Sequence, residues 1–90
     1  MSINTPTVLL DFYSDLCNPC KRLMSDLDEL APELNGIEIK KLNIMENYDL
    51  TEKYNVRSVP TLIILKDGTS HAYVGYRGKD DLKKFLSESL

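Results

Sequence analysis

A chain of 90 residues has room for one compact domain with one hydrophobic core, and we expect residues 1–90 to form a single domain. Hydrophobic residues make up 42% of the chain and charged residues 28%, which excludes a disordered or fibrous protein. The formal charge of -3 comes from interspersed acids and bases without a basic cluster, so nucleic acid is not an expected partner.

Signals for export and for membrane insertion are missing from the sequence. The segment from Met1 to Pro6 is polar and lacks the basic residues, apolar run and cleavage site of a secretory peptide. No apolar stretch reaches the roughly 20 residues that span a bilayer. We therefore expect no membrane partner and a cytoplasmic location. In that compartment two cysteines three positions apart are typical of catalysis or metal binding.

The first two predicted elements are a buried strand and a helix. The segment from Thr7 to Tyr13 is apolar, β-branched and aromatic except for Asp11, which predicts a central strand buried on both faces. After the cysteines, leucines recur at steps of four, three and four, as on a helix that packs against a sheet. Pro32 should break the last turn, and Asn35-Gly36 should end the helix. The recurring residues are Leu23, Leu27, Leu30 and Leu34.

A second strand and a short helix follow. Alternating apolar and polar residues predict a strand from Ile37 to about Asn43. Strand, helix and strand in this order predict a right-handed parallel crossover. Asn47 can cap the short helix, and Asn55 suits the left-handed conformation that often ends one.

The last third of the chain predicts a hairpin and a final helix. The segment from Thr61 to Leu65 is another buried strand, and Lys66-Asp67-Gly68 is a turn signal before a strand from about Ser70 to Val74. The segment from Lys79 to Leu90 has one apolar helical face. The order β-α-β-α-β-β-α predicts an α/β fold, with a four-stranded mixed sheet covered by helices on both faces.

The residues that carry chemistry are Cys17 and Cys20, which lie where the first strand ends and the first helix begins. A helix N-terminus has unpaired N–H groups and a partial positive charge, which stabilise a thiolate. Cys17 is expected at that end and exposed, and Cys20 one turn inside. A structural disulfide and half of a zinc site are the alternatives. Zinc is disfavoured because a closed site needs four ligands and only His71 is a further candidate, which we expect on the surface of the hairpin.

The cysteine motif and several others along the chain resemble those of the thioredoxin family, over roughly residues 7 to 90. The motifs fall in the family's order and near its spacing, and a Val-Pro-Thr some forty residues after the paired cysteines makes the resemblance specific. It implies a thioredoxin-like fold and thiol-disulfide exchange. The matching segments are Asp11-Phe12-Tyr13, Cys17-x-Pro-Cys20-Lys21, Lys41-Leu42-Asn43, Val59-Pro60-Thr61, Lys66-Asp67-Gly68 and Val74-Gly75.

The sequence also departs from the family's pattern around Cys17. Family members usually have Trp before the first cysteine and Gly after it, whereas this chain has Leu16 and Asn18 there and no Trp. Ser25 stands where many thioredoxins have a helix-kinking proline, and the family's leading strand and helix are absent. In length the chain is closer to a glutaredoxin.

Asp11 and Lys41 are candidates for proton transfer. Asp11 interrupts an apolar strand, where an unpaired carboxylate is costly, and by resemblance it matches the buried acid behind the thioredoxin disulfide. Its alternative is a polar residue at a strand end. Lys41 shares strand parity with Ile37 and Ile39, so it could be a partner for Asp11 or a solvated lysine.

The resemblance also implies a surface that binds substrate around the cysteines. Pro60 is expected to be cis and to face them, with Val59 offering its backbone to an extended substrate, although Pro60 could also simply open its strand. Gly75 would permit close approach, or else form a bulge or turn. The side chains expected at this surface beside Cys17 are Leu16, Asn18 and Pro19.

The expected activity is reduction of protein disulfides, in which Cys17 attacks the substrate and Cys20 resolves the mixed disulfide. The resemblance implies a flavin-containing thioredoxin reductase as electron donor. A glutaredoxin-like enzyme recharged by glutathione is one alternative, and a non-catalytic binding module that docks on a larger enzyme is another. We expect a monomer, and no cofactor-binding or metal-binding signature is present in the sequence.

Overall fold

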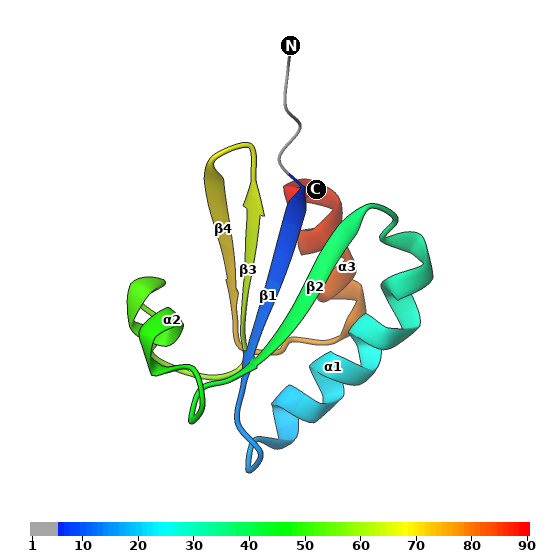
Figure 1. The fold of residues 1–90 in the computed structure, drawn as a ribbon. Coiled ribbons are helices and arrows are strands. Elements are labelled where there is room, and N and C mark those ends of the chain that lie inside the picture. Colours follow the sequence, from blue (N-terminus) through cyan, green and yellow to red (C-terminus); the bar gives the residue numbers. More distant parts are fainter. Residues whose placement is uncertain (1–5) are drawn as a thin grey trace.

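The computed structural model describes residues 6–90. Four strands within them form one sheet in the order β2-β1-β3-β4 (Figure 1). The segment from Met1 to Pro6, expected to carry no secretory signal, lies outside the described residues apart from Pro6. Strand β1 pairs in parallel with β2 and antiparallel with β3, which pairs antiparallel with β4. The mixed sheet with a central first strand is therefore confirmed. The strands are β1 (Thr7–Tyr13), β2 (Ile37–Asn43), β3 (Thr61–Lys66) and β4 (Thr69–Val74).

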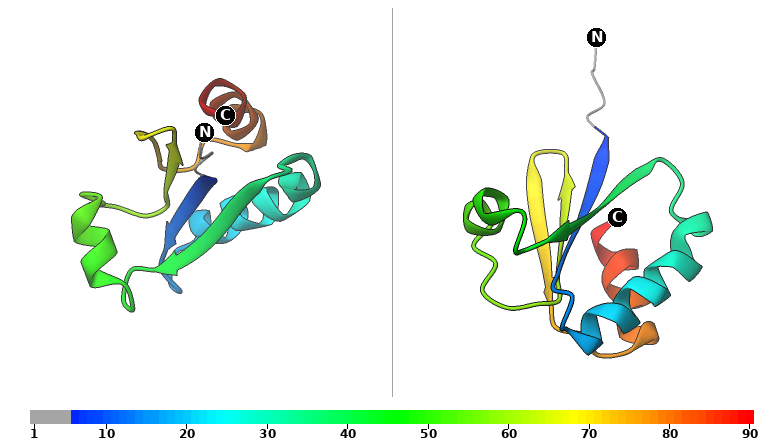
Figure 2. Two further views of the ribbon diagram at one scale, coloured as in Figure 1. Left: turned by 45° about the horizontal axis from the view of Figure 1, so that its top comes forward. Right: turned by 60° about the horizontal axis from the view of Figure 1, so that its bottom comes forward.

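Helices cover both faces of the sheet, as predicted. Figure 2 shows α1 and α3 together on one side and the short α2 alone on the other. None of the described helices is long and apolar enough to cross a bilayer. The helices are α1 (Asn18–Leu30), the 3-10 turn η1 (Ala31–Glu33), α2 (Tyr48–Lys53) and α3 (Lys79–Ser89).

Strand β1 supplies apolar side chains to both sides of the sheet, because successive residues of a strand point to opposite faces. Leu9 packs on the side of α1 and α3, whereas Leu10 and Phe12 pack on the side of α2. Asp11 shares the parity of Leu9, so its carboxylate is placed among the apolar residues under α1. The buried residues of that cluster are Leu9, Leu23, Leu27, Leu30, Leu62, Ile64, Tyr73, Leu82 and Leu86.

The helix boundaries follow local chemistry with two exceptions. Helix α1 runs unbroken past Ser25 and ends at Leu30, and the chain continues through Pro32 in η1, so the predicted break is confirmed. The helix does not reach Asn35-Gly36, where it was expected to end, because the chain leaves the α-helix before Pro32. Asn55 has a φ of 55° and takes the expected left-handed conformation after α2. Asn47 is the N-cap residue of α2, as expected, but it does not cap the helix with its side chain. Its side chain makes no cap bond, because its Nδ2 donates to the Asn43 carbonyl oxygen at 2.9 Å instead.

The sheet topology brings several segments to the end at which the cysteines lie. Strand β1 ends there, and because β3 is antiparallel to β1 and β4 is antiparallel to β3, β3 begins and β4 ends at the same end. Gly75 directly follows β4, and Pro60 directly precedes β3. The Gly75 backbone N donates a hydrogen bond to the Pro60 carbonyl oxygen at 2.8 Å. His71 is exposed on β4, as expected for a surface residue of the hairpin.

Candidate active site

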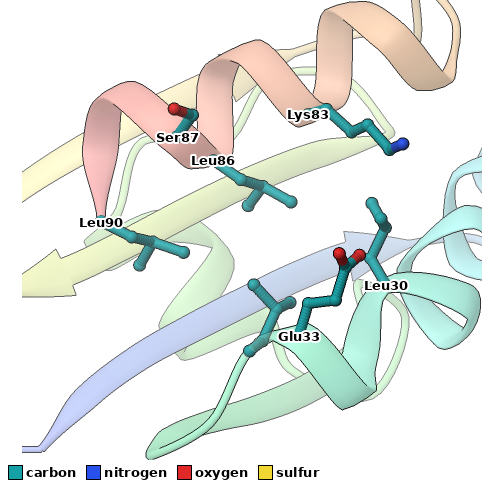
Figure 3. Close-up of a pocket in the computed structure, with 7 residues that line it drawn as sticks. Leu30, Glu33, Lys83, Leu86, Ser87 and Leu90 are labelled. Carbon is teal, nitrogen blue, oxygen red and sulfur yellow. The ribbon is translucent and has the colours of Figure 1, made fainter.

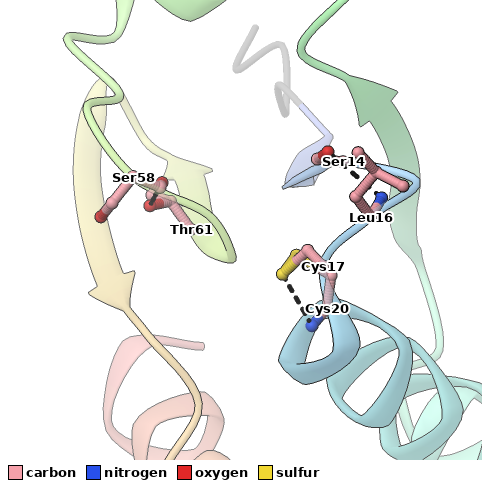
Figure 4. Close-up of a disulfide and its surroundings, with 6 residues drawn as sticks. All are labelled: Ser14, Leu16, Cys17, Cys20, Ser58 and Thr61. Carbon is pink, nitrogen blue, oxygen red and sulfur yellow. Dashed lines mark hydrogen bonds between the residues drawn. A yellow bond between two sulfur atoms is a disulfide. The ribbon is translucent and has the colours of Figure 1, made fainter.

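Cys17 occupies the N-cap position of α1, where the loop after β1 turns into the helix. Its backbone is extended, with φ -97° and ψ 104°, and its Sγ accepts a hydrogen bond from the Cys20 backbone N at 3.1 Å (Figure 4). Pro19 lies in the first turn, where its missing N–H would have had no helical partner. The helix end therefore directs N–H groups and positive partial charge at Cys17, and both stabilise a thiolate.

The two cysteines form a disulfide bond, with their Cα atoms 5.2 Å apart. Cys20 is 0% exposed and faces the sheet, one helical turn before the buried Leu23. Cys17 is half-buried, and so less exposed than predicted, because the chain before it turns back and its N donates to the Ser14 carbonyl oxygen at 3.1 Å. Of the two sulfur atoms, only that of Cys17 belongs to a residue open to an incoming substrate.

The residues beside Cys17 form an open rim. Leu16 is 94% exposed, which is unusual for a large apolar side chain, and its backbone N donates a hydrogen bond to Ser14 Oγ at 3.4 Å. Asn18 and Pro19 are also exposed. Their side chains are thus free to meet a partner, and no residue of the described part of the chain, 6–90, covers Leu16.

The segment before β3 lies on the side toward which Cys17 Sγ points (Figure 4). The Val59–Pro60 peptide bond is cis, with Pro60 buried and Val59 half-buried. Thr61 Oγ1 donates to the Ser58 carbonyl oxygen at 2.8 Å and holds this turn. Gly75 has a φ of +84°, which favours glycine, and a Cβ built there would meet no atom within 4 Å. The position therefore faces open space, as required of a surface that a substrate backbone approaches.

Asp11 is the most perturbed titratable group of the site. Its residue is 0% exposed, and among residues 6–90 neither carboxylate oxygen has a hydrogen-bond partner. Burial raises the pKa of Asp11 to about 7, the nearby Lys41 ammonium lowers it, and the Asp28 carboxylate raises it. A carboxyl group with a pKa near neutrality can both accept and release a proton under ordinary conditions.

Lys41 lies beside Asp11 in the sheet without bonding to it. The two residues are in register on the parallel strands β1 and β2. The Lys41 Nζ instead donates to Asp28 Oδ1 on α1 at 2.9 Å, and 38% of its side chain is exposed. Lys41 is therefore neither a bonded partner of Asp11 nor a fully solvated lysine, which were the two roles considered from sequence. Sequence reasoning missed Asp28, whose only signal is its place next to the buried Leu27 at the edge of the apolar stripe.

A second set of contacts ties the loop after β4 to α1. Tyr76 directly follows Gly75, and its hydroxyl group donates a hydrogen bond to Asp26 Oδ2 on α1. The Lys79 ammonium at the start of α3 pairs with Glu29, also on α1. These contacts were not found from sequence, since the hydrogen-bonded residues are 50 positions apart. They hold the Gly75 segment against the helix that carries the cysteines.

An apolar cavity of about 360 Å³ lies away from this site, between the C-terminal end of α1, η1 and α3 (Figure 3). It contains no cysteine, and its charged residues are exposed. Among residues 6–90 no group of three or more His, Cys, Asp or Glu is arranged to hold a metal ion. The lining residues of the cavity are Leu30, Glu33, Leu34, Lys83, Leu86, Ser87 and Leu90.

Comparison with known proteins agrees with this geometry. The family model described as Thioredoxin matches residues 2–88. Thioredoxin of Pseudomonas aeruginosa is 42% identical over 85 residues, covering 92% of this chain and 79% of the relative. Thioredoxin of Chlamydia trachomatis is 42% identical over 88 residues, covering 97% and 86%. The structure of a mutant thioredoxin from Halobacterium salinarum matches with a TM-score of 0.80 at 36% identity, covering 93% of this chain and 74% of that one.

The matches extend over almost the whole chain, and the fold and the cysteine pair at the start of α1 are those expected of the family. The chain belongs to the thioredoxin family and is a thiol-disulfide oxidoreductase that works through Cys17 and Cys20.

Proposed function

We propose that the protein reduces disulfide bonds of other proteins, with Cys17 as the nucleophile and Cys20 as the resolving thiol. The observation that carries the assignment is the asymmetry of the pair at the start of α1. Cys17 is the N-cap residue and is partly open to solvent, whereas Cys20 is completely buried. A substrate sulfur can therefore meet only Cys17, and the helix N-terminus favours the thiolate at the same position.

In the first step the Cys17 thiolate attacks one sulfur of the substrate disulfide. A new bond forms between Cys17 Sγ and that sulfur, and the other substrate sulfur leaves as a thiolate that takes a proton from water. The rim beside Cys17, the Val59–Pro60 segment and Gly75 support binding of an extended chain, because the segment before β3 lies on the side toward which Cys17 Sγ points and Gly75 faces open space. The proposed docking residues are Leu16, Asn18, Pro19, Val59, Pro60 and Gly75.

In the second step the Cys20 thiol loses its proton and attacks Cys17 Sγ. The Cys17–Cys20 disulfide forms, and the second substrate sulfur leaves, so two electrons have passed to the substrate. Asp11 is the proposed proton acceptor, directly or through one water molecule. Support comes from its position, since Asp11 and Cys20 are both buried between β1 and α1, and from a pKa raised to about 7.

The cycle closes when another protein or thiol reduces the Cys17–Cys20 disulfide. Family membership favours a thioredoxin reductase as donor, acting in a reducing cytoplasm, over glutathione. The exposed Leu16 next to Cys17 supports a protein donor, because a large apolar contact suits a protein surface more than a small polar tripeptide.

Insulin reduction tests the proposal. Purified protein should accelerate precipitation of the reduced insulin chains with NADPH and a bacterial thioredoxin reductase, and much less with glutathione and glutathione reductase. Cys17→Ser should abolish the activity, whereas Cys20→Ser should trap the mixed disulfide with substrate. His71→Gln, an exposed change on β4, is the matched control and should keep full activity. Equal turnover with glutathione would contradict the proposed donor, and an active Cys17→Ser variant would contradict the chemistry.

A further inference from the structure

A buried carboxylate and a lysine lie in register on neighbouring strands without forming an ion pair. Asp11 on β1 and Lys41 on β2 are parallel-strand partners, so their side chains start on the same face of the sheet. Asp11 is 0% exposed, and among the described residues its two oxygens have no hydrogen-bond partner. An isolated buried carboxylate ordinarily acquires a counter-ion when one is within reach. Some other group must therefore hold Lys41.

That group is Asp28 on α1. Its Oδ1 accepts a hydrogen bond from Lys41 Nζ at 2.9 Å, within an ion pair whose side chains are 38% and 67% exposed for Lys41 and Asp28. Asp28 follows the buried Leu27, so the packing of α1 on the sheet fixes where its carboxylate sits. The ion pair thereby holds the Lys41 ammonium at the protein surface, although the Lys41 side chain starts on the same face of the sheet as Asp11.

We propose that Asp28 is a positioning residue for the resolving step, which holds the Lys41 ammonium away from Asp11 and so keeps Asp11 unpaired as a proton acceptor. The inference rests on the role proposed above for Asp11. A carboxylate in a direct ion pair with an ammonium is a weaker base, because the pair stabilises its ionised form. With Asp28 in place, Lys41 is engaged and Asp11 retains its affinity for the Cys20 proton.

The groups around Asp11 make the direction of this effect clear. Strand β2 contributes the Lys41 ammonium and α1 contributes the Asp28 carboxylate, and Cys20 is a buried residue of the same helix. Strand β3 contributes the apolar Leu62 as its register partner. Loss of the Asp28 charge removes a repulsion that raises the pKa of Asp11, and it also frees Lys41 to turn toward Asp11. Both changes favour the ionised carboxylate.

Titration of the Asp11 carboxyl carbon by NMR in the reduced protein tests the inference without using activity. In Asp28→Asn the midpoint of Asp11 should move to lower pH, whereas Asp28→Glu should restore much of the wild-type value. Glu33→Gln removes another exposed acid, on η1, and is the matched control, so it should leave the midpoint in place. Asp11→Asn identifies the resonance.

A double-mutant cycle separates the two causes of the shift, which are the lost repulsion between Asp28 and Asp11 and the release of Lys41. In a Lys41→Met background the Asp28→Asn change should shift the Asp11 midpoint by less than it does with Lys41 present, because only the direct repulsion remains. Rapid-quench rates should show the acid limb of mixed-disulfide decay moving to lower pH in Asp28→Asn. An unchanged or raised midpoint in Asp28→Asn would overturn the positioning role. A lowered midpoint together with wild-type decay in Asp11→Asn would uphold the positioning and reject Asp11 as the proton acceptor.

Discussion

Replacing Asp11 by Asn keeps the shape of the side chain and removes the buried charge, so its effect on stability should depend strongly on pH. The pKa of Asp11 is raised in the folded protein from 3.8 to about 7, chiefly by burial. Between these two values the folded state binds one proton more than the unfolded state. Wild-type stability therefore falls as pH rises through this window, and the full penalty is present above it.

The size of the effect follows from the width of the window. A shift from 3.8 to about 7 spans roughly 3 pH units, and each unit corresponds to about 1.4 kcal/mol, so the penalty is about 4 kcal/mol at mildly alkaline pH. Asn bears no such penalty at any pH. The free energy of unfolding of Asp11→Asn, relative to wild type, should thus be about 4 kcal/mol larger near pH 8 than near pH 4.

Urea unfolding of the oxidised proteins gives this difference directly. Far-ultraviolet circular dichroism is the suitable probe, because the chain has no Trp. The other carboxylates are common to both proteins and cancel in the comparison to first order. A stability difference that stays constant between the two pH values would refute the argument, because it would mean that Asp11 is not buried as an unpaired acid.

Further changes should give equally definite results. Alkylation of the reduced protein should label Cys17 before Cys20, because only Cys17 is at the helix N-terminus and partly open, and faster labelling of Cys20 would reverse the assignment. Equilibration with glutathione should place the reduction potential between about -280 and -200 mV, and a value near that of DsbA would contradict a reductant. In Asp11→Asn, decay of the mixed disulfide should slow far more than its formation, as measured by rapid quench, whereas a wild-type decay rate would remove Asp11 from the mechanism. Gly75→Ala should lower the free energy of unfolding by about 1 kcal/mol in urea titrations because of the φ of +84°, and an unchanged value would show that the loop adapts.

Much of the fold was determined by the sequence itself, because the patterns that decide it are local. The run from Thr7 to Tyr13, apolar except for Asp11, is typical of a strand inside a sheet, and β1 is central. Pro32 ends α1 because it has no N–H for the helix, and Asn55 tolerates the left-handed conformation. The cysteine pair, too, could be placed at a helix start from the strand before it and the leucine spacing after it.

The tertiary structure alone decided which charged groups meet at the site. Lys41 bonds Asp28 and not Asp11, and Tyr76 bonds Asp26, because α1 packs across the sheet and brings together side chains 13 and 50 positions apart. No periodicity along the chain encodes such pairings. Sequence patterns report which face of an element is apolar, whereas the partner of each polar side chain depends on the distances and angles at which the packed elements settle.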